Sequence, residues 1–303
     1  VADIYIYTYD DSGRLLRKEW DEESANGGDS PDGVAERVFT YAYDASGNPL
    51  REERDGGSGY GDADGVADWI STYAYDDSGN LVRREWDRDG DGTSEEIRTY
   101  TYDDSGNQVG SELDGSAAYG DADGVVDRVN TYTYDASGNL LLTEEDSGAD
   151  GTIDGLITFT YDASGNLVRK EADAGADGTI DWVETWAFDA SGNLVRWDRD
   201  SDADGTLDWV YTHAYDESGN RVRMEMDGGY GDDADGTIDR VFTYTYDDSG
   251  NLVLTDGDSD ADGTLDWVDT YTYDASGNLV QIDEDWGADG SIDWATTYTY
   301  DCP

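Results

Sequence analysis

The sequence predicts an all-β chain of antiparallel β-hairpin repeats, in about ten units with a 27-residue period. Three observations predict this fold class. The segment Tyr-Thr-Tyr-Asp-Ala-Ser-Gly-Asn-Leu returns along the whole chain with small variations, the residues before it alternate with period two, and Asp-Gly-rich loops separate the copies. We therefore expect residues 1–303 to form one repeat-array domain, an elongated spiral sheet or β-solenoid in which each unit contacts mainly its neighbours.

The Asp of the recurring Tyr-Asp pair fixes the register of the repeat. It falls at Asp10, Asp44, Asp76, Asp103, Asp135, Asp162, Asp189, Asp216, Asp247, Asp274 and Asp301. Six of the ten intervals are 27 residues, and the others are 31 to 34 residues. All the insertions fall in one loop of the unit, so the strands themselves keep a constant length.

Each unit is predicted to contain two strands. The first, for example residues 180–189, alternates with period two and is rich in β-branched and aromatic residues, which fits a pleated strand better than a helix. The second, for example residues 81–86, is shorter and follows an Asp-Ser-Gly-Asn turn. An acidic loop such as residues 198–208 leads to the next unit. Because sequential strands usually pair, we expect a meander, with a β-solenoid of one turn per repeat as the alternative.

The charge of the chain restricts its partners. Asp and Glu number 73 against 18 Lys and Arg, a net charge of −55 that requires bound cations in a compact fold. Nucleic acid and anionic membranes are excluded as main partners because both need clustered basic residues. Disorder is also excluded, because 23 Tyr and 10 Trp recur at fixed places in the repeat. No stretch reaches the roughly 20 apolar residues of a spanning helix, so membrane insertion is not expected.

An extracellular or cell-surface location is expected. The chain begins at Val1 without a basic segment and apolar core, so we expect any signal peptide to have been removed. The single cysteine, Cys302, cannot form an internal disulfide. Metal ions are then the expected stabilising links of an exported chain.

The acidic loops have the spacing of calcium ligands. Ca²⁺ takes six to eight oxygen ligands, and Asp at alternate positions followed by Gly lets a short chain wrap around the ion. The pattern D-x-D-x-D-G-x-x-[DE] is complete at Asp87, Asp89, Asp91 with Glu95; at Asp200, Asp202, Asp204 with Asp208; and at Asp258, Asp260, Asp262 with Asp266. We predict several Ca²⁺ ions per chain at these loops.

The other units keep the half of the loop nearest the following strand, an Asp-Gly pair with a second acid three residues after the Gly. These pairs are Asp64 and Asp68, Asp123 and Asp127, Asp150 and Asp154, Asp177 and Asp181, Asp235 and Asp239, and Asp289 and Asp293. In two of these loops the third position is Gly175 or Gly287, so fewer oxygens are available and weaker binding is expected.

The segment Tyr-x-Tyr-Asp-x-x-Gly-Asn-Leu resembles the core of the YD (RHS-type) repeat. It occurs ten times between residues 7 and 279, in several copies with one or two positions changed, and there is a truncated copy at residues 298–301. The resemblance implies a secreted or cell-surface protein whose hairpins wind into a spiral sheet. The loops resemble the Asp-rich calcium loops of dockerins and thrombospondin type 3 repeats. The acidic loops and the longer period depart from the YD pattern.

We interpret the protein as a secreted, calcium-stabilised structural element that forms a filament or stalk, and not as an enzyme. The only histidine, His213, occupies an aromatic position of the repeat. Both ends of the chain read as uncapped strands, residues 1–10 and 298–301, which predicts end-to-end self-association.

Two alternative functions remain open. The first is a carbohydrate- or surface-binding adhesin, with a polysaccharide or a cell surface as partner, because tryptophans occupy equivalent places in five units. They are Trp69, Trp182, Trp209, Trp267 and Trp294. The second is an ice-binding module, because Thr-x-Thr pairs recur on the other face of the first strand, as in Thr131 with Thr133 and Thr270 with Thr272.

Overall fold

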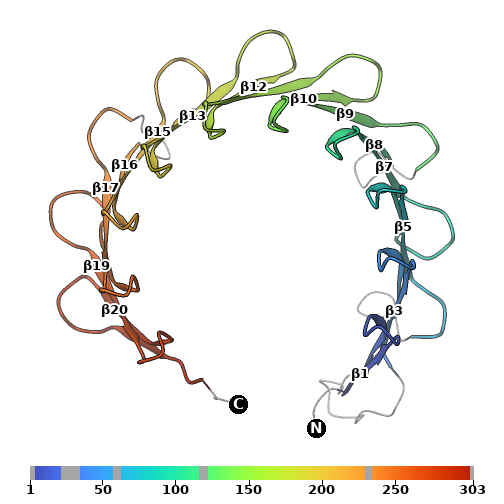
Figure 1. The fold of residues 1–303 in the computed structure, drawn as a ribbon, viewed down its shortest axis with the longest axis horizontal. Coiled ribbons are helices and arrows are strands. Elements are labelled where there is room, and N and C mark those ends of the chain that lie inside the picture. The colour runs from blue at the N-terminus through green and yellow to red at the C-terminus, as the bar shows by residue number, and fades with distance from the viewer. Residues whose placement is uncertain (1–3, 22–34, 57–62, 116–121, 229–233, 301–303) are drawn as a thin grey trace. The chain divides into compact units, whose positions relative to one another are not determined.

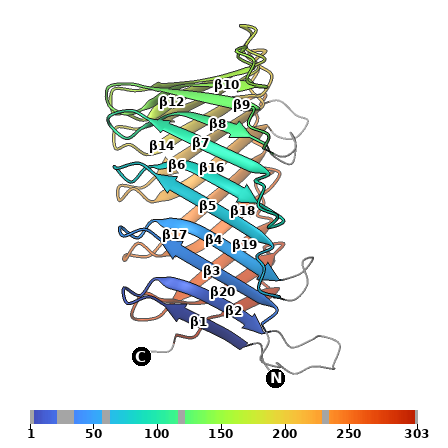
Figure 2. The ribbon, with the colours of Figure 1, turned by 90° about the vertical axis from the view of Figure 1, so that its right-hand side faces the viewer.

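The protein is built of β-strands joined by turns and loops (Figures 1 and 2). The computed structural model describes residues 4–21, 35–56, 63–115, 122–228 and 234–300. These residues form 21 strands, and none of them is helical. The described residues therefore include no helix that could span a membrane.

The odd-numbered strands are the first strands of the hairpins, and the even-numbered strands are the second. The first strands are β1 (Ile4–Tyr9), β3 (Arg37–Tyr43), β5 (Trp69–Tyr75), β7 (Glu96–Tyr102), β9 (Arg128–Tyr134), β11 (Gly155–Tyr161), β13 (Trp182–Phe188), β15 (Trp209–Tyr215), β17 (Arg240–Tyr246), β19 (Trp267–Tyr273) and β21 (Trp294–Thr297). The second strands are β2 (Leu15–Asp21), β4 (Pro49–Gly56), β6 (Leu81–Asp87), β8 (Gln108–Asp114), β10 (Leu140–Ser147), β12 (Leu167–Ala174), β14 (Leu194–Asp200), β16 (Arg221–Gly228), β18 (Leu252–Asp258) and β20 (Leu279–Trp286).

The second strands are longer than the sequence predicts. We expected a short strand over residues 81–86, but β6 has 7 residues, as many as β5, and ends at Asp87. The extra residue is drawn into the sheet because Asp87 pairs with Ile70 of β5. The first acid of each acidic loop therefore belongs to a strand.

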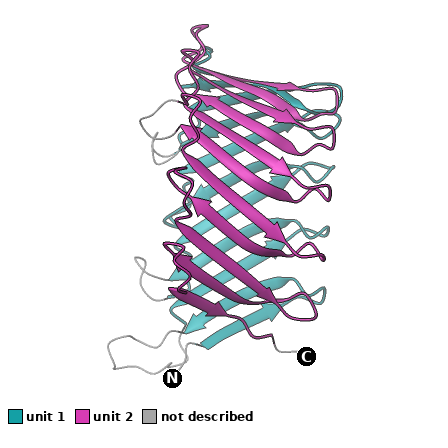
Figure 3. Ribbon diagram, turned by 90° about the vertical axis from the view of Figure 1, so that its left-hand side faces the viewer, with its two compact units in different colours: residues 1–155 teal, residues 156–303 magenta. Residues whose placement is uncertain are grey.

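The chain divides into two compact units, residues 1–155 and 156–303 (Figure 3). In the first unit each strand from β1 to β10 pairs antiparallel with the next. In the second unit the strands from β12 to β21 do the same. This sequential pairing is the predicted meander. In each unit the hairpin turns lie along one edge of the sheet and the acidic loops along the other (Figures 2 and 3).

Each hairpin turn is held by the Asp of the Tyr-Asp pair or of its Phe-Asp equivalent. Asp189 Oδ1 accepts hydrogen bonds from the backbone N–H groups of Ser191 and Asn193, at 2.8 and 2.9 Å. Its Oδ2 accepts a third from the Asn193 side chain at 3.0 Å. Gly192 has a φ of 86°, a left-handed conformation that only Gly adopts without strain. These bonds to the charged form lower the pKa of Asp189, with the Asn193 side chain as the largest cause.

The Tyr of the same pair links neighbouring hairpins. The Tyr215 hydroxyl donates to the carbonyl oxygen of Leu194, at the start of the preceding second strand, at 2.9 Å. Equivalent bonds are made by Tyr102, Tyr134, Tyr246, Tyr273 and Tyr300. The Tyr-Asp pair therefore has two structural functions, because its Asp closes one turn and its Tyr ties that hairpin to the previous one.

Each unit is a single layer of strands, so its sheet has no conventional core. Only four apolar side chains are buried among the described residues: Val38, Ala172, Val210 and Met226. The fold therefore depends on cross-strand contacts and hydrogen bonds more than on a packed interior. Alternate residues of each strand define two faces, which differ in chemistry.

We call one side the aromatic face. On β15 it carries Trp209, Tyr211, His213 and Tyr215. Trp209 stacks on Tyr211 of the same strand, with ring centroids 6.3 Å apart. Basic side chains lie against these rings, and Lys170 Nζ lies 4.9 Å from the ring centroid of Trp182. Aromatic and cation–π contacts thus replace part of the missing core.

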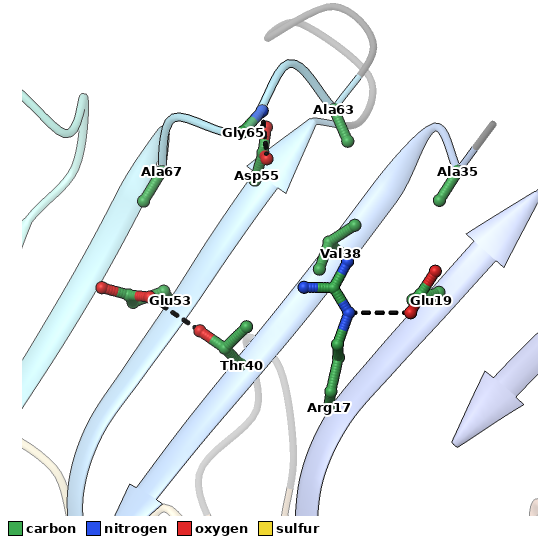
Figure 4. Close-up of a pocket in the computed structure, with 10 residues that line it drawn as sticks. All are labelled: Arg17, Glu19, Ala35, Val38, Thr40, Glu53, Asp55, Ala63, Gly65 and Ala67. Atoms are coloured by element: carbon green, nitrogen blue, oxygen red, sulfur yellow. Dashed lines mark hydrogen bonds and ion pairs between the residues drawn. The ribbon is translucent and has the colours of Figure 1, made fainter. Parts of the chain in front are cut away.

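We call the opposite side the threonine face, where Thr, acidic and Arg side chains form a repeated network. Thr40 Oγ1 donates to Glu53 Oε2 at 2.7 Å, and Arg17 pairs with Glu19 at 2.7 Å (Figure 4). The Thr-to-carboxylate bond recurs from Thr99, Thr131, Thr212 and Thr243. The Arg pair recurs at Arg51, Arg83, Arg169, Arg196 and Arg223. The hydroxyls of these threonines are thus bonded within the protein.

Candidate metal-binding loops

The loop at residues 200–208 shows how a complete acidic loop is built. Asp200, the last residue of β14, is only 7% exposed, and its Oδ2 accepts the Gly205 N–H at 2.9 Å. At the other end, Asp208 Oδ2 accepts the Ser201 N–H at 2.5 Å. The Asp208 N–H donates to the carbonyl of Arg199 at 2.8 Å. The two outer carboxylates are thereby fixed by the backbone of their own loop.

Carboxylate oxygens converge in each of the three complete loops. One oxygen from each member of a group lies within 4.8 Å of the others. The groups are Asp87, Asp89, Asp91 and Glu95; Asp200, Asp202 and Asp208; and Asp258, Asp260 and Asp262. Three or four converging carboxylates, with loop carbonyls and water to complete the shell, suit a hard divalent cation.

The buried oxygens of Asp87 and Asp200 are the strongest indication of a ligand. Each residue is only 7% exposed. The Oδ1 atom of each is buried and has no hydrogen-bond partner. An unpaired buried carboxylate oxygen costs at least about 1–3 kcal/mol, so native structures rarely leave one without a partner or a cation. Both residues belong to the converging groups, where a cation would satisfy such an oxygen.

Two predicted ligands do not join their groups. Asp204 lies outside the group of its loop, and Asp266 lies outside that of loop 258–266. Asp204 Oδ1 accepts the Thr206 N–H at 2.7 Å, and this bond is the largest cause of its lowered pKa. Asp266 Oδ2 accepts the Ser259 N–H at 2.5 Å. One carboxylate oxygen of each of these two residues is therefore bonded to the backbone.

Loop 146–154 has Gly148 at its third position, as the two loops with Gly175 and Gly287 do, and all three loops close on their own backbone amides. In loop 146–154, Asp146 Oδ1 accepts the Asp150 N–H at 3.1 Å and Oδ2 accepts the Gly151 N–H at 2.8 Å. Gly148 has a φ of 111°, which an Asp does not adopt without strain. Loops 173–181 and 285–293 repeat these bonds through Asp173 and Asp285. The backbone amide at the fifth position supplies the positive partner there.

The sequence-predicted pairs in these three loops gather no group of three carboxylates in the described part of the chain. They are Asp150 and Asp154, Asp177 and Asp181, and Asp289 and Asp293. Their last members accept the N–H of the second loop residue: Asp154 from Ser147, Asp181 from Ala174 and Asp293 from Trp286. The observed partners of these last carboxylates are therefore backbone amides of their own loops.

The longer loops follow the same plan across their insertions. Asp55 accepts the N–H groups of Asp64 and Gly65 at 3.0 and 2.8 Å, and Asp68 accepts the Gly56 N–H at 2.7 Å. Asp114 with Asp123 and Asp127 repeats this arrangement. Asp239 accepts the Gly228 N–H at 2.7 Å, and Asp235 accepts the Thr237 N–H at 2.8 Å. Among the described residues, these loops also bring no three carboxylates together.

One residue of every loop was missed by considering the Asp-Gly half alone. It is the acid that stands last or next to last in the second strand, at Asp55, Asp114, Asp146, Asp173, Asp227 and Asp285. Its signal in the sequence is a constant place after the second strand. The Oδ1 atom of Asp227 is buried without a hydrogen-bond partner, as in Asp87 and Asp200.

Neighbouring loops contact each other through their backbones. The Gly287 N–H donates to the carbonyl of Asp266 at 2.5 Å, and the Ala234 N–H donates to that of Leu207 at 2.7 Å. A Cβ added to Gly228 would lie 1.9 Å from the Asp208 carbonyl oxygen. The last residues of a complete loop are therefore fixed against the next loop.

The other candidate residues lie on the aromatic face. Trp69, Trp182, Trp209 and Trp267 begin first strands and are partly exposed, and Trp294 is 58% exposed. A second strand lies between successive tryptophans of a unit, so they alternate with the side chains of that strand. His213 is half-buried opposite Met224, and burial, with a smaller effect of Arg221, lowers its pKa.

Comparison with known proteins adds distant similarities. No family model and no curated protein matches the chain. The crystal structure of TcdB2-TccC3-TEV is 16% identical with a TM-score of 0.39, covering 97% of this chain and 16% of that chain. TcdB2-TccC3 is 16% identical with a TM-score of 0.38, covering 97% and 20%. A porin-like protein from Bacteroides uniformis is 14% identical with a TM-score of 0.32, covering 82% and 90%.

This chain spans at most a fifth of the length of those two TcdB2-TccC3 chains. At these identities and TM-scores the similarities carry no argument about function, which is therefore drawn from the geometry of the loops and faces.

Proposed function

We propose that the protein is a calcium-stabilised structural scaffold that works outside the cell. The observation that supports this proposal best is the buried, unpaired Oδ1 of Asp87 and of Asp200 within the converging carboxylate groups. A divalent ion there would satisfy an oxygen that no protein donor reaches. It would also offset the repulsion between adjacent carboxylates.

The ligand set favours Ca²⁺ over other metals and a weak affinity over a tight one. All the converging ligands are carboxylate oxygens, which suits Ca²⁺ and not the softer metals that prefer His or Cys. The groups hold three or four carboxylates and no bidentate Glu at the twelfth position. We therefore expect dissociation constants of about 0.1–1 mM, the range of extracellular calcium modules. Such sites fill outside the cell and stay empty in the cytosol.

The scaffold function follows from the repeat. Hairpins linked by Tyr hydroxyls and by stacked loops form a regular array over the described residues. The Ser of each turn has no catalytic base as a partner and donates its backbone N–H to the turn Asp, as Ser191 does to Asp189. End-to-end self-association remains a prediction, which sedimentation velocity in calcium tests.

The test compares equivalent residues of two loops. Asp200→Asn should abolish the extra stability of its hairpin that calcium provides, about 2.7 kcal/mol at a hundredfold excess over the dissociation constant. Asp146→Asn changes the same position of a loop closed by its own amides, so it should leave the effect of calcium unchanged. Hydrogen exchange and melting are measured in EDTA and in millimolar Ca²⁺. A wild-type chain whose stability is identical in both solutions contradicts the proposal.

A further inference from the structure

The basic residues of the first unit are distributed unequally between the two faces of its sheet. From β2 to β7 the aromatic face carries Lys18, Arg37, Arg54, Arg84 and Arg98. The acids on this part of the face are Glu52 and Glu96. In the whole chain, by contrast, acids outnumber basic residues by 73 to 18. A local excess of positive charge therefore lies on one face of a strongly acidic protein.

Three cations of the aromatic face differ in their partners from the cations of the threonine face, whereas Arg98 on the aromatic face pairs with Glu96 at 2.7 Å. On the threonine face Arg17, Arg51 and Arg83 each pair with a carboxylate at 2.6–2.7 Å. On the aromatic face Lys18, Arg37 and Arg84 form no ion pair with any described residue. Arg84 uses one N–H to reach Ser71 at 3.3 Å, which leaves most of its donors for another acceptor.

Aromatic rings hold these unpaired cations in place. The Arg84 guanidinium lies 3.7 Å from the ring centroid of Trp86 and 5.1 Å from that of Tyr73. Arg37 lies 4.2 Å from the ring centroid of Trp20. All these side chains are partly exposed. The result is a surface of partly exposed rings and fixed guanidinium groups, which we call the aromatic–basic stripe.

We propose that the aromatic–basic stripe binds an acidic polysaccharide, a polymer of uronic acid. Aromatic faces stack on sugar rings, and guanidinium groups bind carboxylates in a bidentate manner. Strands lie about 4.8 Å apart. Lys18 and Arg54 both lie opposite Phe39, and Arg84 lies opposite Arg98, so a chain of anionic sugars can lie along these rows. This site is on a sheet face, separate from the calcium loops, and does not depend on the proposed scaffold function.

The net charge of the protein does not prevent this binding. At physiological salt, charges are screened beyond about 8 Å, so a ligand on the stripe responds mainly to nearby side chains. Single-stranded nucleic acid also combines rings with negative charges. The carboxylate-rich loops beside the stripe would repel a nucleic acid, whose phosphates are closely spaced, more strongly than a polyuronate, whose charge density is lower.

Adjacent arginines provide a matched test. Arg84 belongs to the stripe, whereas Arg83 lies on the threonine face and pairs with Glu85 at 2.7 Å. Binding of galacturonate hexamers to the full chain is measured by titration calorimetry in millimolar Ca²⁺. R84Q should weaken binding about tenfold, as expected for loss of a charge-assisted contact, and R83Q should change it less than about twofold. Circular dichroism verifies that both variants are folded.

Two further ligands complete the test. Hexamers whose carboxylates have been reduced to alcohols should bind at least about tenfold more weakly than the acid form. Oligothymidylate should bind more weakly than the hexuronate. Three outcomes would overturn the proposal: no hexuronate binding, equal losses in R83Q and R84Q, or tighter binding of the neutral sugar or of oligothymidylate. If uronate were instead held by calcium ions bridging it to the acidic loops, R83Q and R84Q would change the affinity equally. This outcome distinguishes calcium bridging from binding on the stripe.

Discussion

Replacing Asp202 by Gly should convert a calcium-dependent loop into one that closes by itself. The variant loop would begin Asp-Ser-Gly-Ala-Asp-Gly, the sequence of residues 146–151. In that natural loop Gly148 has a φ of 111° and Asp146 Oδ1 accepts the amide of the fifth residue at 3.1 Å. We expect Asp200 Oδ1, which lacks a hydrogen-bond partner, to accept the corresponding amide in the variant.

The expected effect changes sign with calcium. Without calcium, satisfying a buried carboxylate oxygen gains about 1–3 kcal/mol. The greater backbone freedom of Gly in the unfolded chain costs about 0.5–1 kcal/mol. The D202G loop should then be about 1 kcal/mol more stable than the wild-type loop in EDTA. With calcium at a hundredfold excess over its dissociation constant, the wild-type loop gains about 2.7 kcal/mol that the variant cannot recover. The variant should then be less stable by about 1–2 kcal/mol.

Hydrogen exchange in β14 and β15 is the appropriate assay, because a repeat reports mainly on its own neighbourhood. E217A serves as the control. It also removes one negative charge from the second unit, but at a hairpin turn on the opposite edge, where a surface change should stay within about 0.5 kcal/mol. Protection that changes in the same direction in EDTA and in calcium would refute the assignment of Asp202 to a metal site.

Three further predictions address the links of the repeat. Y215F removes a hydroxyl bonded to the preceding hairpin and should lower the local free energy of unfolding by about 0.5–1.5 kcal/mol, measured by hydrogen exchange. G228A should unfold its loop, because the new Cβ would lie 1.9 Å from a carbonyl oxygen. In G205A the new Cβ would meet no atom within 4 Å, so the positive φ should lower the free energy of unfolding by only about 1–2 kcal/mol. Urea denaturation compares the two variants. The pKa of Asp189 is lowered in the folded protein, so its contribution to stability is present above the pKa of the unfolded chain, about 4, and is lost as the pH falls through the folded pKa. In D189N the midpoint of urea denaturation should therefore fall less steeply between about pH 5 and pH 2 than it does in the wild type.

The hairpin meander could be predicted because every level of the sequence agrees with it. The alternation of residues 180–189 predicts a strand, and β13 covers Trp182–Phe188. The Asp-x-Ser-Gly-Asn turn, with Arg14 in place of Asn in the first unit, and the described acidic loops fall between strands. Insertions fall in loops, so they leave the strand register unchanged. Local preference and long-range pairing therefore point to the same structure.

The chemistry of the loops could be predicted only in part. Spacing located the carboxylates, because a loop of nine residues brings its ends together. Spacing could not show that an amide satisfies Oδ1 of Asp146 and of Asp258 while Asp200 Oδ1 has no donor, since this depends on the backbone conformation of each loop. The Thr–acid–Arg network was also missed. Its signal was Arg and an acid two residues apart, as in Arg17 and Glu19, which places both on one face of a strand.

The net charge alone does not identify the cation sites. Calcium ions in the three converging groups would cancel two charges each, which leaves most of the −55 uncompensated. The remaining carboxylates therefore need partners other than metal, and the structure shows these partners: turn amides for Asp189, threonine hydroxyls for Glu53, arginines for Glu19. A sheet without a packed core can hold so many acids because most of them lie at the surface, where water and salt screen their repulsion. A cation would be needed where a carboxylate is buried, has an oxygen without a donor and lies among converging carboxylates. These conditions together, more than the abundance of Asp, distinguish Asp87 and Asp200 from Asp227, which lies in no such group among the described residues.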